Sequence, residues 1–156
     1  MLICSADVTE PGFLELACYK LDTGISVNVF EHIEMDELAL QNIRRVLTSG
    51  ARLIMIVPAH QALYGEMDRT IGHYRRYTKH SMAEKMGKAG YEVLHQRYVN
   101  LIGALGWYLN GRILKRKTPP EGQLKLMNLM MGFVKTVEGP IEFPLGISLV
   151  TVARVS

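Results

Sequence analysis

RLIMIV, residues 52–57, is a nearly continuous apolar run that stops at Pro58. Such a run is typical of a strand in a sheet that is covered on both faces. A second compact run, GISVNVF at residues 24–30, contains β-branched residues and predicts another buried strand. The two runs therefore predict two strands joined by the residues between them.

A helix is expected in this connection, from Asp36 to Leu47. Leu40, Ile43 and Leu47 recur at i, i+3 and i+7, which places them on one helical face. Asp36 is a good N-cap, and Gly50 follows as a stop signal.

Further elements are expected on both sides of this unit. They are a short strand at 2–4, helical turns at 12–19, a helix from Thr78 or Ser81 to Ala89, and strands at 91–99 and 147–155. A basic and apolar segment (101–117) and a Met-rich helix (124–137) separate the last two strands. The alternation of strands and helices predicts an α/β fold with a mostly parallel sheet.

Composition fits one globular domain, because the chain has 156 residues, of which 48% are hydrophobic and 21% charged. The net charge of +3 is too small to require a nucleic-acid partner. The first residues do not resemble a signal peptide, and the longest apolar stretch, 98–109, is shorter than the ~20 residues that span a bilayer. Cys4 and Cys18 lack metal-ligand spacing, so a reducing, cytoplasmic location is expected.

Polar residues follow each predicted strand, at the edge where open α/β sheets bind ligands. Asp7 follows the first strand, and Asn28, Glu31 and His32 lie at the end of the second. Each also has a plainer interpretation. Asp7 would be a turn former, Glu31 a partner for the positive end of the next helix, and His32 a structural histidine.

The segment 58–77 has no apolar periodicity and predicts a long loop rich in aromatic residues. Loops of this length are uncommon in compact domains unless they are functional or disordered, so a binding or catalytic role is expected. His60 and His73 lie thirteen residues apart without a cysteine or an HExxH pattern, which argues against a metal site. The basic and aromatic run at 73–80 is weak evidence for nucleic-acid binding.

Several of these segments together resemble the class I S-adenosylmethionine-dependent methyltransferases. NVFEHI at 28–33 resembles their NVLEHI segment, and RVLTSGARL at 45–53 resembles their RVLKPGGRL turn. PAH at 58–60, LYG at 63–65, Asp68 and GHYRRY at 72–77 resemble one bacterial subgroup. Thr48, Ser49 and Ala51 depart from the usual Lys, Pro and Gly.

This resemblance implies that residues 1–156 form a single domain containing the C-terminal portion of a Rossmann-like sheet, mostly parallel with a final antiparallel strand. The family's glycine-rich loop and the acidic residue ending its second strand have no counterpart here, so the domain is expected to be truncated. The implied cofactor is S-adenosyl-L-methionine. Asp7 and Val8 match the position that contacts its adenine, and Asn28 and Val29 match a second cofactor position.

Methyl transfer needs positioning and a base for an acceptor that must lose a proton. His60 and His73 are the candidate bases, with Asp68 as an orienting carboxylate. The residues expected to contact the acceptor are Glu31, His32, Tyr64, Arg75 and Arg76. Alternatively, the two arginines pair with the acidic stretch at 31–37.

The acceptor is expected to be a small molecule or a lipid- or sugar-linked compound. The excursion at about 100–140 would be a substrate cap or an interface, and its Met-rich helix would form a homo-oligomer. Segment 101–117 would either contact a membrane surface or pack against the core. The alternative function is a non-catalytic methyltransferase remnant that acts as a protein-interaction subunit.

Overall fold

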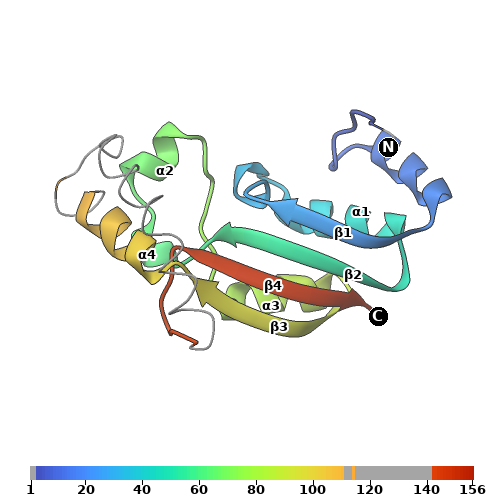
Figure 1. Ribbon diagram of the computed structural model, residues 1–156. Helices are drawn as coiled ribbons and strands as arrows, with labels where there is room; N and C mark the ends of the chain where they lie inside the picture. The colour runs from blue at the N-terminus through green and yellow to red at the C-terminus, as the bar shows by residue number, and fades with distance from the viewer. Residues whose placement is uncertain (1–2, 111–113, 115–141) are drawn as a thin grey trace.

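A four-stranded sheet with the strand order β1-β2-β4-β3 forms the centre of the molecule, which is known from a computed structural model (Figure 1). The structure describes residues 3–110, 114 and 142–156. The strands are β1 (Leu21–Val27), β2 (Leu47–Pro58), β3 (Tyr91–Val99) and β4 (Ser148–Val155). The helices are η1 (Pro11–Tyr19), η2 (Phe30–His32), α1 (Asp36–Val46), η3 (Gln61–Leu63), α2 (Glu66–Thr70), α3 (Lys79–Lys88) and α4 (Leu101–Tyr108).

β4 is the one antiparallel strand of the described sheet. β1 pairs with β2 in parallel, with Ile25 opposite Ile54. β4 lies between β2 and β3 and runs antiparallel to both of them. The α/β fold with a final antiparallel strand is therefore confirmed.

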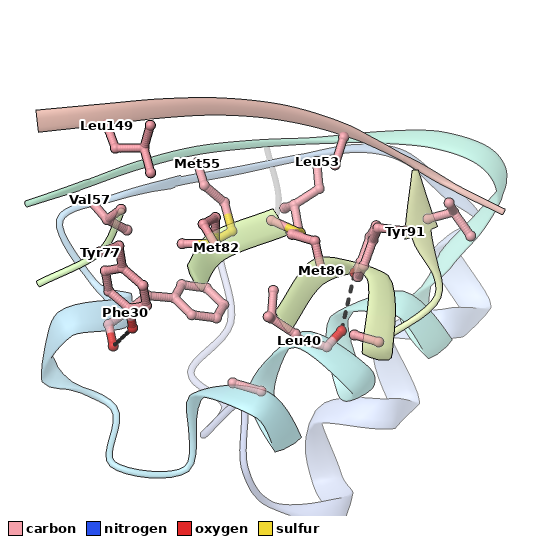
Figure 2. Close-up of a cluster of buried hydrophobic side chains, with 14 of the residues drawn as sticks. Phe30, Leu40, Leu53, Met55, Val57, Tyr77, Met82, Met86, Tyr91 and Leu149 are labelled. Carbon is pink, nitrogen blue, oxygen red and sulfur yellow. Dashed lines mark hydrogen bonds between the residues drawn. The ribbon is translucent and has the colours of Figure 1, made fainter. Parts of the chain in front are cut away.

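The main core lies between the sheet and helices α1 and α3 (Figure 2). Leu53, Met55 and Val57 alternate along β2 and are almost completely buried, as are Met82 and Met86 of α3. Burying an apolar side chain of this size stabilises a fold by about 1.5–3 kcal/mol. The core thus fixes β2 against α3 and places the end of β2 at Pro58 beside the loop that follows.

The opposite face of β2 is less covered than its apolar sequence predicts. Ile54 and Ile56 are only partly buried, and Arg52 is exposed. A run that is apolar at nearly every position was expected to have both faces covered. The described helices α1 and α3 bury one face, so the expectation is met there only.

The first turn of α1 differs from the sequence-based expectation. Asp36 is the first residue of the helix and not its N-cap, which is Met35. Instead of capping the helix, the buried Asp36 carboxylate accepts hydrogen bonds from Tyr77 and Lys85 and pairs with Arg75. These long-range partners explain why a local capping rule placed this residue wrongly.

α3 begins as its sequence predicts. Thr78 is the N-cap, and its Oγ1 accepts a hydrogen bond from the backbone N–H of Ser81 at 3.1 Å. Ser81 Oγ accepts one in return from the N–H of Thr78 at 2.9 Å. A cap of this kind stabilises a helix by about 1 kcal/mol.

Two other predictions need correction. Ile3 and Cys4, the described part of the predicted strand at 2–4, form no strand. The segment after β2 is not without secondary structure, because η3 and α2 lie within it. A bridge between Ala59 and Tyr77 closes this segment into a compact loop. The Met-rich helix predicted at 124–137 lies outside the described residues.

α4 carries part of the basic and apolar segment. Trp107 is partly buried, whereas Leu105, Tyr108 and Leu109 are exposed. Within the described residues, we find no helix with the length and apolar character that crossing a membrane requires.

Candidate functional site

Asn28 stands directly after β1 in a backbone conformation that most residues avoid. Its φ is +51°, in the left-handed region where asparagine is several-fold enriched. Its backbone N–H still donates to the carbonyl of Ile56 at 2.9 Å, so the strand pairing continues up to this residue. The turn then directs the chain into η2, which carries Glu31 and His32.

A cavity of about 340 Å³, called the central cavity below, lies at this end of the sheet. It collects side chains from the end of β1, the end of β2, the loop that follows, α4 and the start of β4. Its lining residues are Asn28, Glu31, His32, Pro58, Ile71, His73, Arg76, Trp107, Ile147 and Ser148. Five of the predicted site residues therefore meet here: Asn28, Glu31, His32, His73 and Arg76.

Asp68 lies completely buried behind the cavity and orders two of its lining residues. Its Oδ1 lies 3.0 Å from Nδ1 of His73 and accepts a hydrogen bond from Nε of Arg76 at 2.7 Å. Its Oδ2 accepts from the N–H of Gly65 at 3.0 Å. A carboxylate only accepts, so Nδ1 of His73 carries the proton and the lone pair lies on Nε2.

Arg76 is a buried cation whose charge Asp68 neutralises. Burial lowers the pKa of Arg76, and the adjacent Asp68 carboxylate opposes this effect. The Arg76 side chain also donates to the Ala59 carbonyl at 3.3 Å and lies 4.6 Å from the centre of the Trp107 ring. These contacts hold the guanidinium in one position beside the cavity.

Glu31 is buried on the same side of the cavity. Its Oε2 has no hydrogen-bond partner among the described residues, and its Oε1 lies 3.8 Å from Nε2 of His73. Burial raises the pKa of Glu31, while His73, His32 and Arg76 oppose the rise. The loop is tied to this position because the N–H of Tyr74 donates to the Glu31 carbonyl at 2.8 Å.

His60 lies in a different environment from His73. It lines an apolar cavity of about 210 Å³ together with Leu63, Leu101 and other residues of η3 and α4. Its ring lies 4.2 Å from that of Tyr98, and its Nε2 is buried without a partner among the described residues. Burial lowers the pKa of His60, and the positive charge of Arg76 acts in the same direction.

Two of the predicted acceptor contacts are engaged within the protein. The hydroxyl of Tyr64 donates to the His73 carbonyl at 2.8 Å. Arg75 lies 2.7 Å from the Asp36 carboxylate and donates to the Glu34 carbonyl at 2.8 Å. Pairing with the acidic stretch, which was the alternative interpretation, therefore describes Arg75 but not Arg76.

The remaining predicted cofactor residues lie elsewhere. The exposed Asp7 accepts hydrogen bonds from the backbone N–H and the hydroxyl of Thr9, and no described strand precedes it. These hydrogen bonds lower the pKa of Asp7. Val8 and Val29 line an apolar cavity of about 320 Å³ along β1. The structure thus places Asn28 at one cavity and Val8 with Val29 at another.

Trp107, Ile71 and Ser148 line the central cavity although the sequence did not mark them as site residues. Trp107 stands in a segment expected to face a membrane or the core. Ser148 reaches the cavity because β4 inserts beside β2, with Ser148 opposite Pro58. Pairing across so long an excursion leaves no local signal in the sequence.

No protein-family model matches this chain, and no curated protein matches it. Solved structures do match. The cyclase SpnF aligns with 97% of this chain and 54% of its own length, at 19% identity and a TM-score of 0.54. An S-adenosylmethionine-dependent methyltransferase from Mesorhizobium loti aligns with 96% of this chain and 67% of its own, at 9% identity and a TM-score of 0.56.

A third match is a complex between the Haloferax volcanii Trm112 methyltransferase activator and a protein assigned as a methyltransferase. It covers 86% of this chain and 54% of the matched chain, at 16% identity and a TM-score of 0.52. The chain thus spans about half the length of two of these proteins. Likeness at such low identity establishes the fold. The chain therefore shares its α/β fold with solved structures that include S-adenosylmethionine-dependent methyltransferases.

Proposed function

We propose that this chain binds S-adenosyl-L-methionine and transfers its methyl group to an acceptor held in the central cavity. The observation that carries the proposal is the position of this cavity. It lies beyond the carboxyl ends of the parallel strands β1 and β2, where α/β sheets bind ligands, and the ordered His73–Asp68 pair faces it. The methyltransferase fold of the structural neighbours supports the same function.

The described residues offer places for the cofactor. The apolar cavity along β1, with Val8 and Val29 in its wall, suits a flat purine ring, and Asn28 stands at the adjoining strand end. Asp7, the residue before Val8, is the proposed adenine contact. No glycine-rich GxGxxG loop occurs in the sequence. Without those backbone donors, cofactor affinity is expected to be weak.

When bound, S-adenosylmethionine supplies an electrophilic methyl group on a positively charged sulfur. The contribution of the protein is to orient the acceptor and take its proton. Nε2 of His73 carries the free lone pair, and Asp68 fixes the ring and stabilises the imidazolium that forms. Arg76 donates a 2.7 Å hydrogen bond to the same Asp68 oxygen and holds the carboxylate in place. His73 is therefore the better candidate base, and His60, in its separate apolar cavity, is the second.

Formation of S-adenosylhomocysteine tests this proposal. The purified chain is incubated with S-adenosylmethionine and a panel of phenols, amines, carboxylates and sugar- or lipid-linked compounds. We expect at least one acceptor to produce S-adenosylhomocysteine above the blank, and His73→Gln to abolish this product. His80→Gln is the matched control, because His80 is an exposed residue of α3. Equal product from both variants, or none from any acceptor, contradicts the proposal.

An acceptor with an apolar portion is favoured by the surface of α4. Leu105, Tyr108 and Leu109 are exposed, and the first two line the cavity that His60 also lines. These side chains suit a lipid-linked acceptor or brief contact with a membrane surface.

Cys4 and Cys18 are both free and exposed, which suits a reducing compartment such as the cytoplasm.

A second candidate function is that of an interaction subunit, as one structural neighbour occurs in a complex with an activator protein. The edge strand β1 favours it, because Ile25 is 69% and Val27 49% exposed. Exposed apolar edge strands pair readily with other chains. Light scattering after size-exclusion chromatography tests this function. Oligomers formed by the wild type and lost in Ile25→Lys would support this function. A wild-type chain that is monomeric at all concentrations would contradict self-association. The oligomer predicted through the Met-rich helix remains a prediction.

A further inference from the structure

Three side chains in the central cavity bring possible metal ligands close together. One such ligand atom from each of Glu31, His32 and His73 lies within 4.8 Å of the other two. The Oε1 of Glu31 is 3.8 Å from Nε2 of His73, and the two histidine rings lie 4.7 Å apart in an edge-to-face arrangement. This cluster is called the triad below.

The tautomer of each histidine follows from its neighbour. Nδ1 of His32 lies 3.2 Å from the Gly72 carbonyl, and Nδ1 of His73 lies 3.0 Å from the Asp68 carboxylate. Both neighbours only accept, so both Nδ1 atoms carry the proton and both Nε2 atoms carry a lone pair. The triad therefore contains two imidazole lone pairs and a carboxylate, with no donor among them.

A cation at the centre of this cluster would pair with the carboxylate and bind both lone pairs. The buried Glu31 has an Oε2 without a partner among the described residues, and a carboxylate taken out of water is costly unless it is paired. Arg76 is near, but Asp68 already neutralises it at 2.7 Å. We infer that the triad binds a divalent first-row transition metal ion through Glu31, His32 and His73.

The surroundings of the triad match those of protein metal sites. Ligating histidines almost always donate their other ring N–H to a carboxylate or a backbone carbonyl, as His73 does to Asp68 and His32 to Gly72. Two imidazoles and one carboxylate suit zinc, iron or cobalt better than magnesium or calcium, which prefer oxygen ligands. The remaining coordination positions would face the cavity of about 340 Å³.

The distances require only a small adjustment. Ligand atoms bound to one zinc ion at ~2.0–2.1 Å lie about 3.3 Å apart. The Oε1 of Glu31 and Nε2 of His73 lie somewhat farther apart, at 3.8 Å. His32 is exposed and lies on the short helix η2, so its ring can rotate without disturbing the core. Glu31 and His73 are held by the burial and hydrogen bonds described above.

Calorimetry with zinc chloride alone tests the inference, because it needs no methyl donor or acceptor. The full chain, carrying Cys4→Ser and Cys18→Ser to remove thiol ligands, is freed of metal and titrated. We expect one zinc ion per chain and no comparable binding of magnesium. His32→Ala and Glu31→Gln should each weaken zinc binding by more than about 100-fold, because loss of an outer partner alone costs 10–100-fold. His80→Ala should leave it unchanged.

His32→Ala is the decisive variant, because an exposed side chain is removed and the fold is retained, which circular dichroism verifies. Absence of one-to-one zinc binding, equal weakening by His80→Ala, or tighter binding of magnesium would overturn the inference. Cobalt absorption provides a second readout, since ligation by imidazole changes its spectrum and His32→Ala should reverse the change. A metal on Nε2 of His73 would occupy the lone pair that the proposed base uses, so the methyl-transfer assay is run with the metal-free chain. Binding of S-adenosylmethionine does not require the metal, so failure here leaves the proposed function untouched.

Discussion

Nδ1 of His73 lies 3.0 Å from Oδ1 of Asp68, and the same oxygen accepts a 2.7 Å hydrogen bond from Arg76. All three residues come from one segment, 68–76, in which α2 and the following turn bring them together. The pair fixes which nitrogen of His73 faces the cavity. This arrangement turns a histidine of the loop into a candidate base or ligand with a defined orientation.

The two candidate bases should respond differently to substitution. Loss of a general base lowers turnover by about 10²–10⁴-fold. We expect His73→Gln to lower turnover by this factor, measured as S-adenosylhomocysteine formation with whichever acceptor the panel identifies. His60→Ala should have a smaller effect, because His60 lines a separate apolar cavity. The reverse order would show that the second cavity holds the reacting groups.

Asp36 should contribute to stability at neutral pH and lose that contribution in acid. Burial opposes its ionisation, but hydrogen bonds from Lys85, Arg75 and Tyr77 prevail and lower the pKa of Asp36. A carboxyl group with a lowered folded-state pKa stabilises above its unfolded pKa of 3.8, and the contribution disappears as the pH falls through the folded value.

Asp36→Asn is the corresponding variant. It leaves Arg75 and Lys85 without their shared carboxylate, so we expect a loss of about 3 kcal/mol at pH 7 in urea unfolding. The difference from the wild type should shrink below about pH 4. Glu37→Gln is the control, since Glu37 is exposed and pairs only with Lys85 among the described residues, so it should change stability by less than about 1 kcal/mol. A pH-independent difference would contradict this interpretation.

Gly90 should tolerate substitution poorly, in contrast to Gly87. Gly90 has a φ of +84°, and an added Cβ would lie 2.5 Å from Nε of Arg44, which donates to the Gly90 carbonyl. We expect Gly90→Ala to destabilise the chain by about 1–2 kcal/mol in thermal unfolding. Gly87 lies in α3 with nothing within 4 Å of the added carbon, so Gly87→Ala should stabilise by about 0.5–1 kcal/mol. Equal effects would show that the turn after α3 accommodates a side chain.

The sequence predicts the regular part of this fold well. β3 has the predicted bounds, Tyr91–Val99, and α3 begins after Thr78, one of the two predicted caps. Both depend on local signals, namely alternating apolar residues and a side chain that bonds to its own helix. Elements specified by nearby residues are the ones that a single sequence reveals.

The candidate site is predicted only in part, because long-range contacts decide it. Asn28, Glu31, His32, His73 and Arg76 share one cavity, as the positions after the strands suggested. The sequence could not show that Arg75 turns away to Asp36 while its neighbour Arg76 turns inward to Asp68. Nor could it show that possible ligand atoms of Glu31, His32 and His73 lie within 4.8 Å of one another, since His73 lies about forty residues from the other two in the sequence.

Binding of S-adenosylmethionine by this chain is the most direct test of the central claim. Backbone NMR spectra recorded during titration detect millimolar affinity, which suits a chain without a glycine-rich loop. We expect the shifts to concentrate at Val8, Asn28, Val29 and Glu31, with His80 on the exposed surface of α3 unchanged. Spectra that do not change at millimolar cofactor would contradict the account. So would shifts confined to residues outside the central cavity and the apolar cavity along β1.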